Sequence, residues 1–433
     1  MYYLKATIMA KMKIIRTLTT LLIFLLVTGN VFATESKPIV ILTTFSEYTI
    51  SQQVEQYRQL FPNTEVRVIF RRTRSALRLL AKDDAQNIDI IISSSPVLFN
   101  HLSTNKQLYA INSPHQVPSW LSPHVIDISG ETTAFGYSGF GLMANRQYLA
   151  SHHLPTPKSW EDLTNAMYFH HITMSTPSRS GTTSLMVENI LQHYGWKDGW
   201  ELLMQIGGNI AFISSRSFGV SEAISKGLIG AAPVIDSYAI NSKKVFNYID
   251  FNYLPNSILM PAYVGIAKKS HSISNAKNFV DFLLSDSGQR ALEKSSMAKY
   301  SLNQPQLAES TSFILNKQLL HRRDALISLL FDQAITEQLH QLNSTWASIH
   351  QLEATNNMPA EAHNKLLQAK QYAAKVPVTE EQSRSPVYLA QFHRDGAKRG
   401  RDPVVAAEIQ RWKEALKQNL QQANHLLNQI NQE

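Results

Sequence analysis

The sequence reads Ser175-Thr-Pro-Ser-Arg-Ser-Gly-Thr-Thr-Ser184 immediately before an apolar-periodic run, Leu185-Met-Val-Glu-Asn-Ile-Leu191. Hydroxyl residues in front of such a run predict a loop that feeds a helix, with Ser178 or Ser180 as its N-cap. The first N–H groups of a helix have no partner within it, and the helix dipole favours negative charge there. An ordinary capped helix without a ligand would show the same residues. The rest of the chain therefore has to indicate whether this helix start binds a ligand.

The functional interpretation is that this helix start binds an oxyanion or a phosphate group. Gly181 would let a ligand approach the backbone, and the hydroxyls lie beside free N–H groups and an arginine. The candidate ligand-binding residues of this stretch are Arg179, Ser180, Gly181, Thr182 and Thr183.

Composition indicates an exported globular protein. The chain has 433 residues, of which 44% are hydrophobic and 17% charged, and it is long enough for two or three domains. Basic residues precede an apolar run at 21–27, and Val31-Phe-Ala33 offers a cleavage site. Residues 1–33 are therefore predicted to be a secretory signal that is cut after Ala33.

The charge and the cysteine content narrow the classes of ligand and of site that the protein can have. The net charge of +8 falls to +4 without the four basic residues of the signal sequence. That excess suits a small anionic ligand and does not argue for nucleic acid. Because the chain has no cysteine, disulfides and thiolate metal sites are excluded.

Three segments, 38–42, 65–70 and 88–92, each read as a strand buried on both faces and followed by a helical pattern. Strands that alternate with helices predict a parallel, doubly wound sheet, which binds ligands at the carboxyl ends of its strands. The candidate residues at these strand ends are Thr43, Thr44, Arg72, Ser94 and Ser95.

A Gly-rich extended stretch at 134–145, which contains Tyr137, interrupts this alternation and is typical of a segment that crosses between two lobes. Residues 257–266 are predicted to cross back. A second strand–helix series between the crossings supplies the candidates Ser214, Ser215, Arg216, Asp236 and Tyr238. We therefore predict an α/β protein with lobe 1 in residues 34–130 and 262–305, lobe 2 in residues 131–261, and a ligand cleft between them.

Residues 306–433 are predicted to form an all-helical C-terminal region. Apolar residues recur at spacings near three and four from Leu319 to Ile349, and no strand pattern follows them. Two interpretations stay open: a helical appendage that packs on a lobe, or an arm that binds a partner.

Enzymatic sites are only weakly indicated. Gly136-Tyr-Ser-Gly-Phe140 resembles a nucleophile elbow but has Phe where that motif needs Gly. The adjacent pairs His152-His153 and His170-His171 would point to opposite faces of a strand and chelate a metal poorly. Since no P-loop lysine motif and no dinucleotide fingerprint is present, we predict a non-enzymatic protein without cofactor or metal.

Three arginines support an anionic ligand. Arg72, Arg179 and Arg216 each lie beside Ser or Thr at a predicted helix start. Guanidinium groups in such positions bind phosphate or carboxylate through charge-assisted hydrogen bonds. Arg74 is a weaker candidate for the same role.

Several sequence segments resemble those of one family, the periplasmic solute-binding proteins of the ferric-iron and phosphate-ester type. Residues 275–289 resemble a closing helix found throughout that family. The phrases at 175–180, 186–188, 213–220 and 233–236 are similar to members that regulate phosphoglycerate transport in enteric bacteria. The resemblance implies a two-lobed, type II periplasmic-binding-protein fold and a location in the periplasm.

The resemblance also implies a sensor for a phosphorylated three-carbon acid, such as phosphoglycerate or phosphoenolpyruvate. Such a sensor works with a membrane sensor histidine kinase to induce phosphoglycerate uptake. One alternative is a delivery protein of an ABC importer for a phosphate ester or ferric iron. Iron binders offer two neighbouring tyrosines, however, and this chain has only Tyr238 at that place. The other alternative is a periplasmic phosphatase.

In the expected complex, phosphate lies on the helix start at 180–183 and receives Arg179 or Arg216. Tyr137, Asp236 and Tyr238 close over the organic part of the ligand, with Asp236 accepting a ligand hydroxyl. Further hydroxyls come from Thr43, Thr44, Ser94, Ser95, Ser214 and Ser215.

Overall fold

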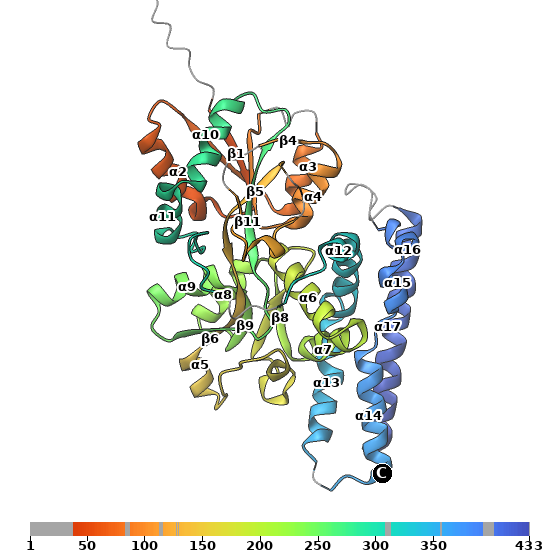
Figure 1. Ribbon diagram of the computed structural model, residues 1–433. Helices are drawn as coiled ribbons and strands as arrows, with labels where there is room; N and C mark the ends of the chain where they lie inside the picture. The colour runs from red at the N-terminus through yellow and green to blue at the C-terminus, as the bar shows by residue number, and fades with distance from the viewer. Residues whose placement is uncertain are drawn as a thin grey trace, which may run out of the picture.

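A computed structural model describes residues 38–82, 87–111, 116–126, 128, 130–307, 313–355, 357–392 and 402–432. The expected signal sequence, residues 1–33, lies outside these residues. The described chain forms two α/β lobes and a helical C-terminal region, called the tail below (Figure 1). Within the described ranges, no helix is both long and apolar enough to cross a membrane.

Lobe 1 is built on a six-stranded sheet in the order β2-β1-β3-β11-β4, with β5 paired to β11. Along β1, Ile39 and Ile41 enter the core on one face of the sheet, and Val40 and Leu42 enter the core on the other. This explains the continuous apolar pattern of the strand. The strands are β1 (Ile39–Thr43), β2 (Val66–Phe70), β3 (Ile90–Ser93), β4 (Leu108–Tyr109), β5 (Thr132–Ser138) and β11 (Met260–Ala267). The helices are α2 (Glu47–Leu60), α3 (Thr73–Leu80), α4 (Pro96–Thr104), the 3-10 turn η1 (Ser122–His124), α10 (Ile273–Leu284) and α11 (Asp286–Lys294).

Lobe 2 is built on a five-stranded sheet in the order β10-β6-β9-β7-β8. The strands are β6 (Phe140–Asn145), β7 (Ile172–Ser175), β8 (Ile210–Ser214), β9 (Ala231–Ile235) and β10 (Ile249–Tyr253). The helices are α5 (Arg146–Ser151), the 3-10 turns η2 (Glu161–Thr164) and η3 (Ala166–Tyr168), α6 (Gly181–His193), α7 (Trp196–Asn209), α8 (Ser217–Ser225) and α9 (Asp236–Val245).

Both sheets are mixed, whereas the sequence predicted parallel ones. β1 runs parallel to β2 and β3, and β7 runs parallel to β8 and β9. In contrast, β11 is antiparallel to its three neighbours, and β6 is antiparallel to β9 and β10. These antiparallel strands belong to the segments that join the lobes, which enter each sheet without a helical crossover.

The first crossing lies at Gly139, between β5 in the sheet of lobe 1 and β6 in the sheet of lobe 2. Residues 254–259 cross back between β10 and β11. The pairing of β5 with β11 gives it a place in lobe 1, although its residues fall within the segment assigned to lobe 2 from the sequence. The domain limits themselves stay a proposal.

The tail consists of helices, as predicted, and packs on lobe 2. In Figure 1, α12 lies beside α6, and α14 and α17 run along each other. α13 and α14 also contact α7. The tail elements are α12 (Lys317–Phe331), the π-helical turn η4 (Asp332–Thr336), α13 (Leu339–Glu353), α14 (Ala360–Ala374), α15 (Glu380–Arg384), α16 (Pro386–Ala390) and α17 (Pro403–Ile430).

One hydrophobic core runs through lobe 2 and the tail. It includes Ile190 of α6 and Trp200 of α7 together with Trp346 of α13 and Trp412 of α17. The contact is close, because a Cβ added at Gly208 of α7 would lie 2.3 Å from Cδ1 of Trp346. Lobe 2 and the tail are therefore packed as one unit.

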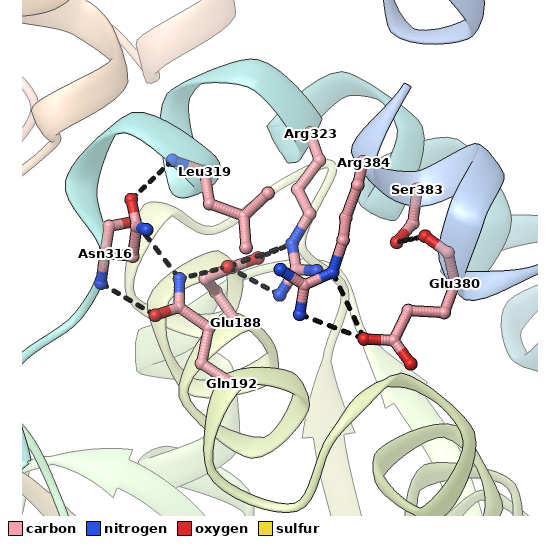
Figure 2. A network of polar contacts seen from close by, with 8 residues as sticks. All are labelled: Glu188, Gln192, Asn316, Leu319, Arg323, Glu380, Ser383 and Arg384. Atoms are coloured by element: carbon pink, nitrogen blue, oxygen red, sulfur yellow. Dashed lines mark hydrogen bonds and ion pairs between the residues drawn. The ribbon is translucent and has the colours of Figure 1, made fainter. Parts of the chain in front are cut away.

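A buried ion pair fixes the tail to α6 (Figure 2). Arg323 of α12 donates from Nε to Oε1 and Oε2 of Glu188 at 3.0 and 2.9 Å, and its Nη2 lies 2.8 Å from Oε1 as an ion pair. Their side chains are only 2% and 1% exposed. Gln192 and Asn316 extend the contact, because Asn316 N donates to Gln192 Oε1 at 2.7 Å. Since an unpaired buried charge is costly, this pair strongly favours one position of α12 on α6.

Candidate functional site

A cleft of about 400 Å³ lies between the two lobes. Six helices begin at its walls: α2, α3 and α4 from lobe 1, and α6, α8 and α9 from lobe 2. Their starts meet there because the preceding strands deliver the chain to the same edge of each sheet. Helix starts carry unpaired N–H groups and the positive end of the helix dipole, so the walls favour an anion.

The start of α6 has the predicted cap. Ser180, rather than Ser178, is the N-cap, and its Oγ accepts a hydrogen bond from Thr183 N at 3.0 Å. The same Oγ lies 2.5 Å from Oγ of Ser217 at the start of α8. A Cβ added at Gly181 would lie 3.8 Å from Cβ of Ser95, so the two lobes approach each other at this point.

The lobe 1 wall also presents hydroxyl groups. Ser95 caps α4 by accepting from Leu98 N at 3.3 Å, and Oγ1 of Thr44 lies 2.6 Å from Oγ of Ser93. Ser94 lines the cleft, but its buried Oγ has no hydrogen-bond partner among the described residues. A buried hydroxyl without a partner costs free energy.

Positive charge dominates the cleft. Arg72, Arg179 and Arg216 line it with exposed side chains, and Lys299 lines it with a buried one. Within the part of the chain that the structure describes, no Asp or Glu lines the cleft. An anion bound there would be attracted by four cations without a competing carboxylate in the wall.

Lys299 is the buried cation of the cleft, with only 3% of its surface exposed. Its Nζ donates to Oγ of Ser138 at 2.8 Å and lies 4.9 Å from the centre of the Phe45 ring. Burial lowers the pKa of Lys299 to about 8, against the attraction of the Asp236 carboxylate. An ammonium group has three N–H donors, so a ligand can accept from those that Ser138 leaves free.

Asp236 holds the first crossing rather than the cleft. Oδ2 of this fully buried residue accepts from Gly139 N at 2.6 Å and from Tyr253 Oη at 3.2 Å. Its own N–H donates to Gly139 O at 3.1 Å. Burial raises the pKa of Asp236 to about 6, although the Gly139 N–H and the charge of Lys299 act in the opposite direction. The carboxylate therefore holds the backbone at the first crossing between the lobes.

Tyr137 lies in β5, just before the first crossing. Its ring lies 5.0 Å from the Trp120 ring, and its hydroxyl donates to Gln304 O. Backbone hydrogen bonds in both directions join Tyr137 to Tyr300, just after Lys299. These contacts surround the crossing segment from the lobe 1 side.

Ten of the sixteen candidate residues line the cleft. They are Thr44, Arg72, Ser94, Ser95, Arg179, Ser180, Gly181, Thr182, Arg216 and Tyr238. The six that do not line it are Thr43, Tyr137, Thr183, Ser214, Ser215 and Asp236.

Several of those six are occupied by the protein itself. Oγ1 of Thr43 accepts from Phe45 N at 3.0 Å, and Oγ of Ser214 donates to Arg216 O at 2.9 Å. Oδ2 of Asp236 accepts from Gly139 and Tyr253, and the residue does not line the cleft. We leave all six out of the ligand contacts proposed below.

Sequence reasoning missed other lining residues. Ser46, Thr73, Ser217 and Ser237 stand at helix starts, so the signal that identified Ser95 and Ser180 was present for them too. Lys299 had no such signal, because it follows α11 and reaches the cleft only through the folding of distant segments. The apolar part of the lining consists of Phe45, Phe70, Phe218, Ile235 and Met297.

Comparison with known sequences identifies the family. Residues 85–317 match the family described as bacterial extracellular solute-binding protein. The phosphoglycerate transport regulatory protein PgtC of Salmonella typhimurium is 36% identical over 369 residues, which cover 82% of this chain and 90% of that protein.

Solved structures agree on the fold. The periplasmic binding protein AfuA from Actinobacillus pleuropneumoniae, with exogenous fructose-6-phosphate bound, superposes with a TM-score of 0.58 at 16% identity, covering 72% of this chain and 97% of that one. Iron-bound HitA from Pseudomonas aeruginosa gives 0.52 at 15% identity, with 64% and 88% covered. The two-lobed type II fold of periplasmic binding proteins is thus shared, and the chain belongs to the bacterial extracellular solute-binding proteins.

Proposed function

We propose that the protein binds a phosphorylated three-carbon organic acid, such as phosphoglycerate, in the cleft between its lobes. The observation that carries the proposal is the composition of the cleft wall: six helix starts and four cations, without an Asp or Glu among the described lining residues. A doubly charged phosphate group uses both the helix dipoles and the charge-assisted hydrogen bonds.

The two walls suit different parts of such a ligand. The phosphate group would lie at the start of α6, beside Gly181 and Thr182. It would accept hydrogen bonds from the guanidinium group of Arg179 or Arg216. Ser94 and Lys299 would bind the remaining oxygen atoms, the first as a hydroxyl without another partner and the second as a desolvated cation. Charged hydrogen bonds strengthen when water is excluded, so closure of the lobes would favour the bound state.

The nature of the cations argues against ferric iron. Arginine and lysine repel a metal ion, and among the described residues the cleft wall offers one tyrosine, Tyr238, instead of a pair. The chain is therefore unlike an iron carrier in its chemistry, although iron-bound proteins share its fold. Phosphoglycerate is preferred within the phosphate esters because the relative PgtC, a regulator of phosphoglycerate transport, matches over most of both chains.

We infer further that the protein acts in the periplasm, after removal of residues 1–33, and regulates phosphoglycerate uptake through a membrane sensor histidine kinase. Delivery of a phosphate ester to an ABC importer is the second candidate, since AfuA, a periplasmic binding protein of the same fold, has fructose-6-phosphate bound. Catalysis is not part of the proposal.

Calorimetric titration with 3-phosphoglycerate, glycerate, glucose 6-phosphate and ferric citrate tests the ligand. We expect 3-phosphoglycerate to bind most tightly and Arg179→Ala to weaken it at least tenfold. Arg71→Ala removes an equal charge from an exposed residue outside the cleft and should change the affinity less than twofold. Binding of ferric citrate alone would refute the proposal. Release of phosphate from 3-phosphoglycerate would show a phosphatase instead.

Expression of Arg179→Ala in cells that lack the wild-type protein separates sensing from delivery. If the protein is a sensor, induction of the uptake genes is lost, but uptake persists when those genes are expressed constitutively. If it is a delivery protein, uptake is lost in both strains.

A further inference from the structure

A second cavity adjoins the cleft on the side of the tail. It has a volume of about 200 Å³ and is called the tail-side groove here. Lobe 1 contributes α3 and the start of α4, lobe 2 contributes the loop before α6 and its first turns, and the tail contributes α12. The residues that line this groove but not the cleft include Arg74, Arg78, Ser178, Ser184, Asp324 and Ser328.

The groove and the cleft are adjacent cavities that share part of their lining. Six residues line both of them: Arg72, Thr73, Ser95, Arg179, Ser180 and Gly181. The start of α6 and the start of α4 therefore lie at the junction, where two anionic groups can approach them from opposite sides.

The groove is strongly positive. Of the residues that the structure describes, four arginines line it, Arg72, Arg74, Arg78 and Arg179, against one carboxylate, Asp324. That carboxylate is engaged, because its Oδ1 accepts from Oγ of Ser184 at 2.6 Å. The local excess of positive charge is thus left without a matching anion in the lining.

The arginines of the groove have few partners of their own. In the described ranges, the side chains of Arg72, Arg74 and Arg179 make no hydrogen bond or ion pair, and that of Arg78 donates only to Ser75 Oγ at 3.3 Å. Arg74 and Arg78 also stand four residues apart on one face of α3, a like-charge spacing that destabilises a helix. An anion between these guanidinium groups would relieve that repulsion.

We propose that the tail-side groove is a second anion subsite that takes a phosphate or carboxylate group. The group is either the second anionic group of the ligand bound in the cleft or a separate inorganic anion. The first source rests on the function proposed above, whereas the second does not.

The tail is part of this subsite. Leu320, Asp324 and Ser328 of α12 form its wall, and α12 is held on α6 by the buried Arg323–Glu188 pair. An anion in the groove would bond α3 of lobe 1 while it lies against α12. Occupancy of the groove would then favour one distance between lobe 1 and the tail, a change that a partner bound to the tail can detect.

Calorimetry with three probes tests the subsite: inorganic phosphate, glycerol 3-phosphate, which has no carboxylate, and 3-phosphoglycerate. The test variant is Arg74→Gln/Arg78→Gln. Its matched control, Arg67→Gln/Arg71→Gln, removes two charges from exposed residues of lobe 1 that line neither cavity. All four side chains are exposed, so both variants are expected to fold, and circular dichroism checks this.

If the groove takes the second group of the ligand, the test variant loses at least tenfold in affinity for 3-phosphoglycerate and less than twofold for glycerol 3-phosphate. If it takes a separate anion, the wild type binds inorganic phosphate when 3-phosphoglycerate saturates the cleft, and the test variant does not. Asp324→Asn should strengthen binding of the anion in the groove in either case, because it removes the negative charge contributed by the tail. The subsite is refuted if the test variant equals its control with all three probes.

The two proposals fail differently. If wild-type protein binds inorganic phosphate through Arg74 and Arg78 but binds neither organic phosphate, the groove stands and the proposed function is wrong. If the organic phosphates bind and the test variant equals its control, the function stands and the groove is not a subsite. If the wild-type protein binds none of the three probes, both the proposed function and the subsite are refuted.

Discussion

Lys299 combines two properties that rarely occur together, because it is a buried cation and it lines a cleft. Burial favours the neutral amine and lowers its pKa to about 8. The side chain is therefore an ammonium at pH 7 but loses its proton at a pH where ordinary lysines keep theirs. An anionic ligand would stabilise the ammonium form of Lys299. The lysine would therefore take up a proton when the ligand binds near pH 8.

We predict that ligand affinity falls at least tenfold between pH 7.5 and pH 9.5, since a charged hydrogen bond contributes about 1.5–3 kcal/mol. The second pKa of a phosphate ester is about 6, so the ligand charge stays constant in this range. Calorimetry at several pH values measures the effect. Lys299→Met should bind more weakly at pH 7.5 and show little further loss, and an equal pH dependence in both proteins would contradict the assignment.

Ser94 and Ser95 are adjacent hydroxyls with opposite expected effects on stability. Ser94→Ala removes a buried hydroxyl without a partner and should raise the free energy of unfolding by about 1 kcal/mol, while weakening ligand binding about fivefold. Ser95→Ala removes the cap of α4 and should lower the free energy of unfolding by about 1 kcal/mol. Urea unfolding of the ligand-free proteins distinguishes them. A loss of stability in Ser94→Ala would mean that its hydroxyl has a partner in solution.

Local chemistry made part of the site predictable. Ser95, Ser180 and Gly181 were found from the sequence because a cap residue and its helix lie next to each other in the chain. Asp236 was placed in the ligand shell for the same reason, but the Gly139 N–H that binds its carboxylate lies 97 residues away. Such a contact leaves no local pattern.

Among the elements, α6 performs two tasks, since its first turn lines the cleft and its middle holds the tail. Glu188 lies on the same helix as Gly181 and pairs with Arg323 inside the protein. Movement of α6 on ligand binding would therefore be transmitted directly to α12. The coupling is physical, because the pair cannot separate without leaving a buried charge.

We predict that Glu188→Gln lowers the free energy of unfolding by about 3–5 kcal/mol, because it leaves Arg323 buried without an opposite charge. Glu222→Gln is the matched control, since Glu222 pairs with Lys226 on the surface of α8. An exposed pair contributes roughly 0–1 kcal/mol. Chemical denaturation measures both variants, and similar losses in the two would show that the buried pair has no special role.

The elements themselves were largely predictable, but their partners were not. The apolar runs at 38–42 and 231–235 are strands, and the periodic run from Leu319 to Ile349 is helical, as expected. The direction of β11 and β6 could not be read from periodicity, because parallel and antiparallel strands bury the same alternating side chains. The pairing of Glu188 with Arg323, 135 residues apart, was likewise beyond the reach of the sequence.

At the scale of the whole molecule, the tail is not a detachable module. The core shared by α7, α13 and α17 means that removal of the residues after 306 would expose apolar surface of lobe 2. A truncated chain would then lose folding together with function. Point variants on the tail-side groove are the better test of what the tail contributes.

We predict that Gly208→Ala destabilises lobe 2 and the tail together by about 2 kcal/mol, because the added methyl group has no space beside Trp346. Gly181→Ala is the control, since its added Cβ would meet only ordinary contacts. Hydrogen exchange should rise in both α6 and α13 of the Gly208 variant. Faster exchange in α13 alone would indicate that the tail unfolds separately.

The contact of Trp120 with Tyr137 has a consequence for spectroscopy. The sequence has six tryptophans, and the other five are buried in the core of lobe 2 and the tail. Trp120 is half-buried and lies beside the crossing segment in lobe 1. A dissolved quencher should therefore quench the fluorescence of Trp120 more readily than that of the five buried tryptophans. The quenchable fraction of the native fluorescence would then report on the surroundings of the crossing segment without an attached dye.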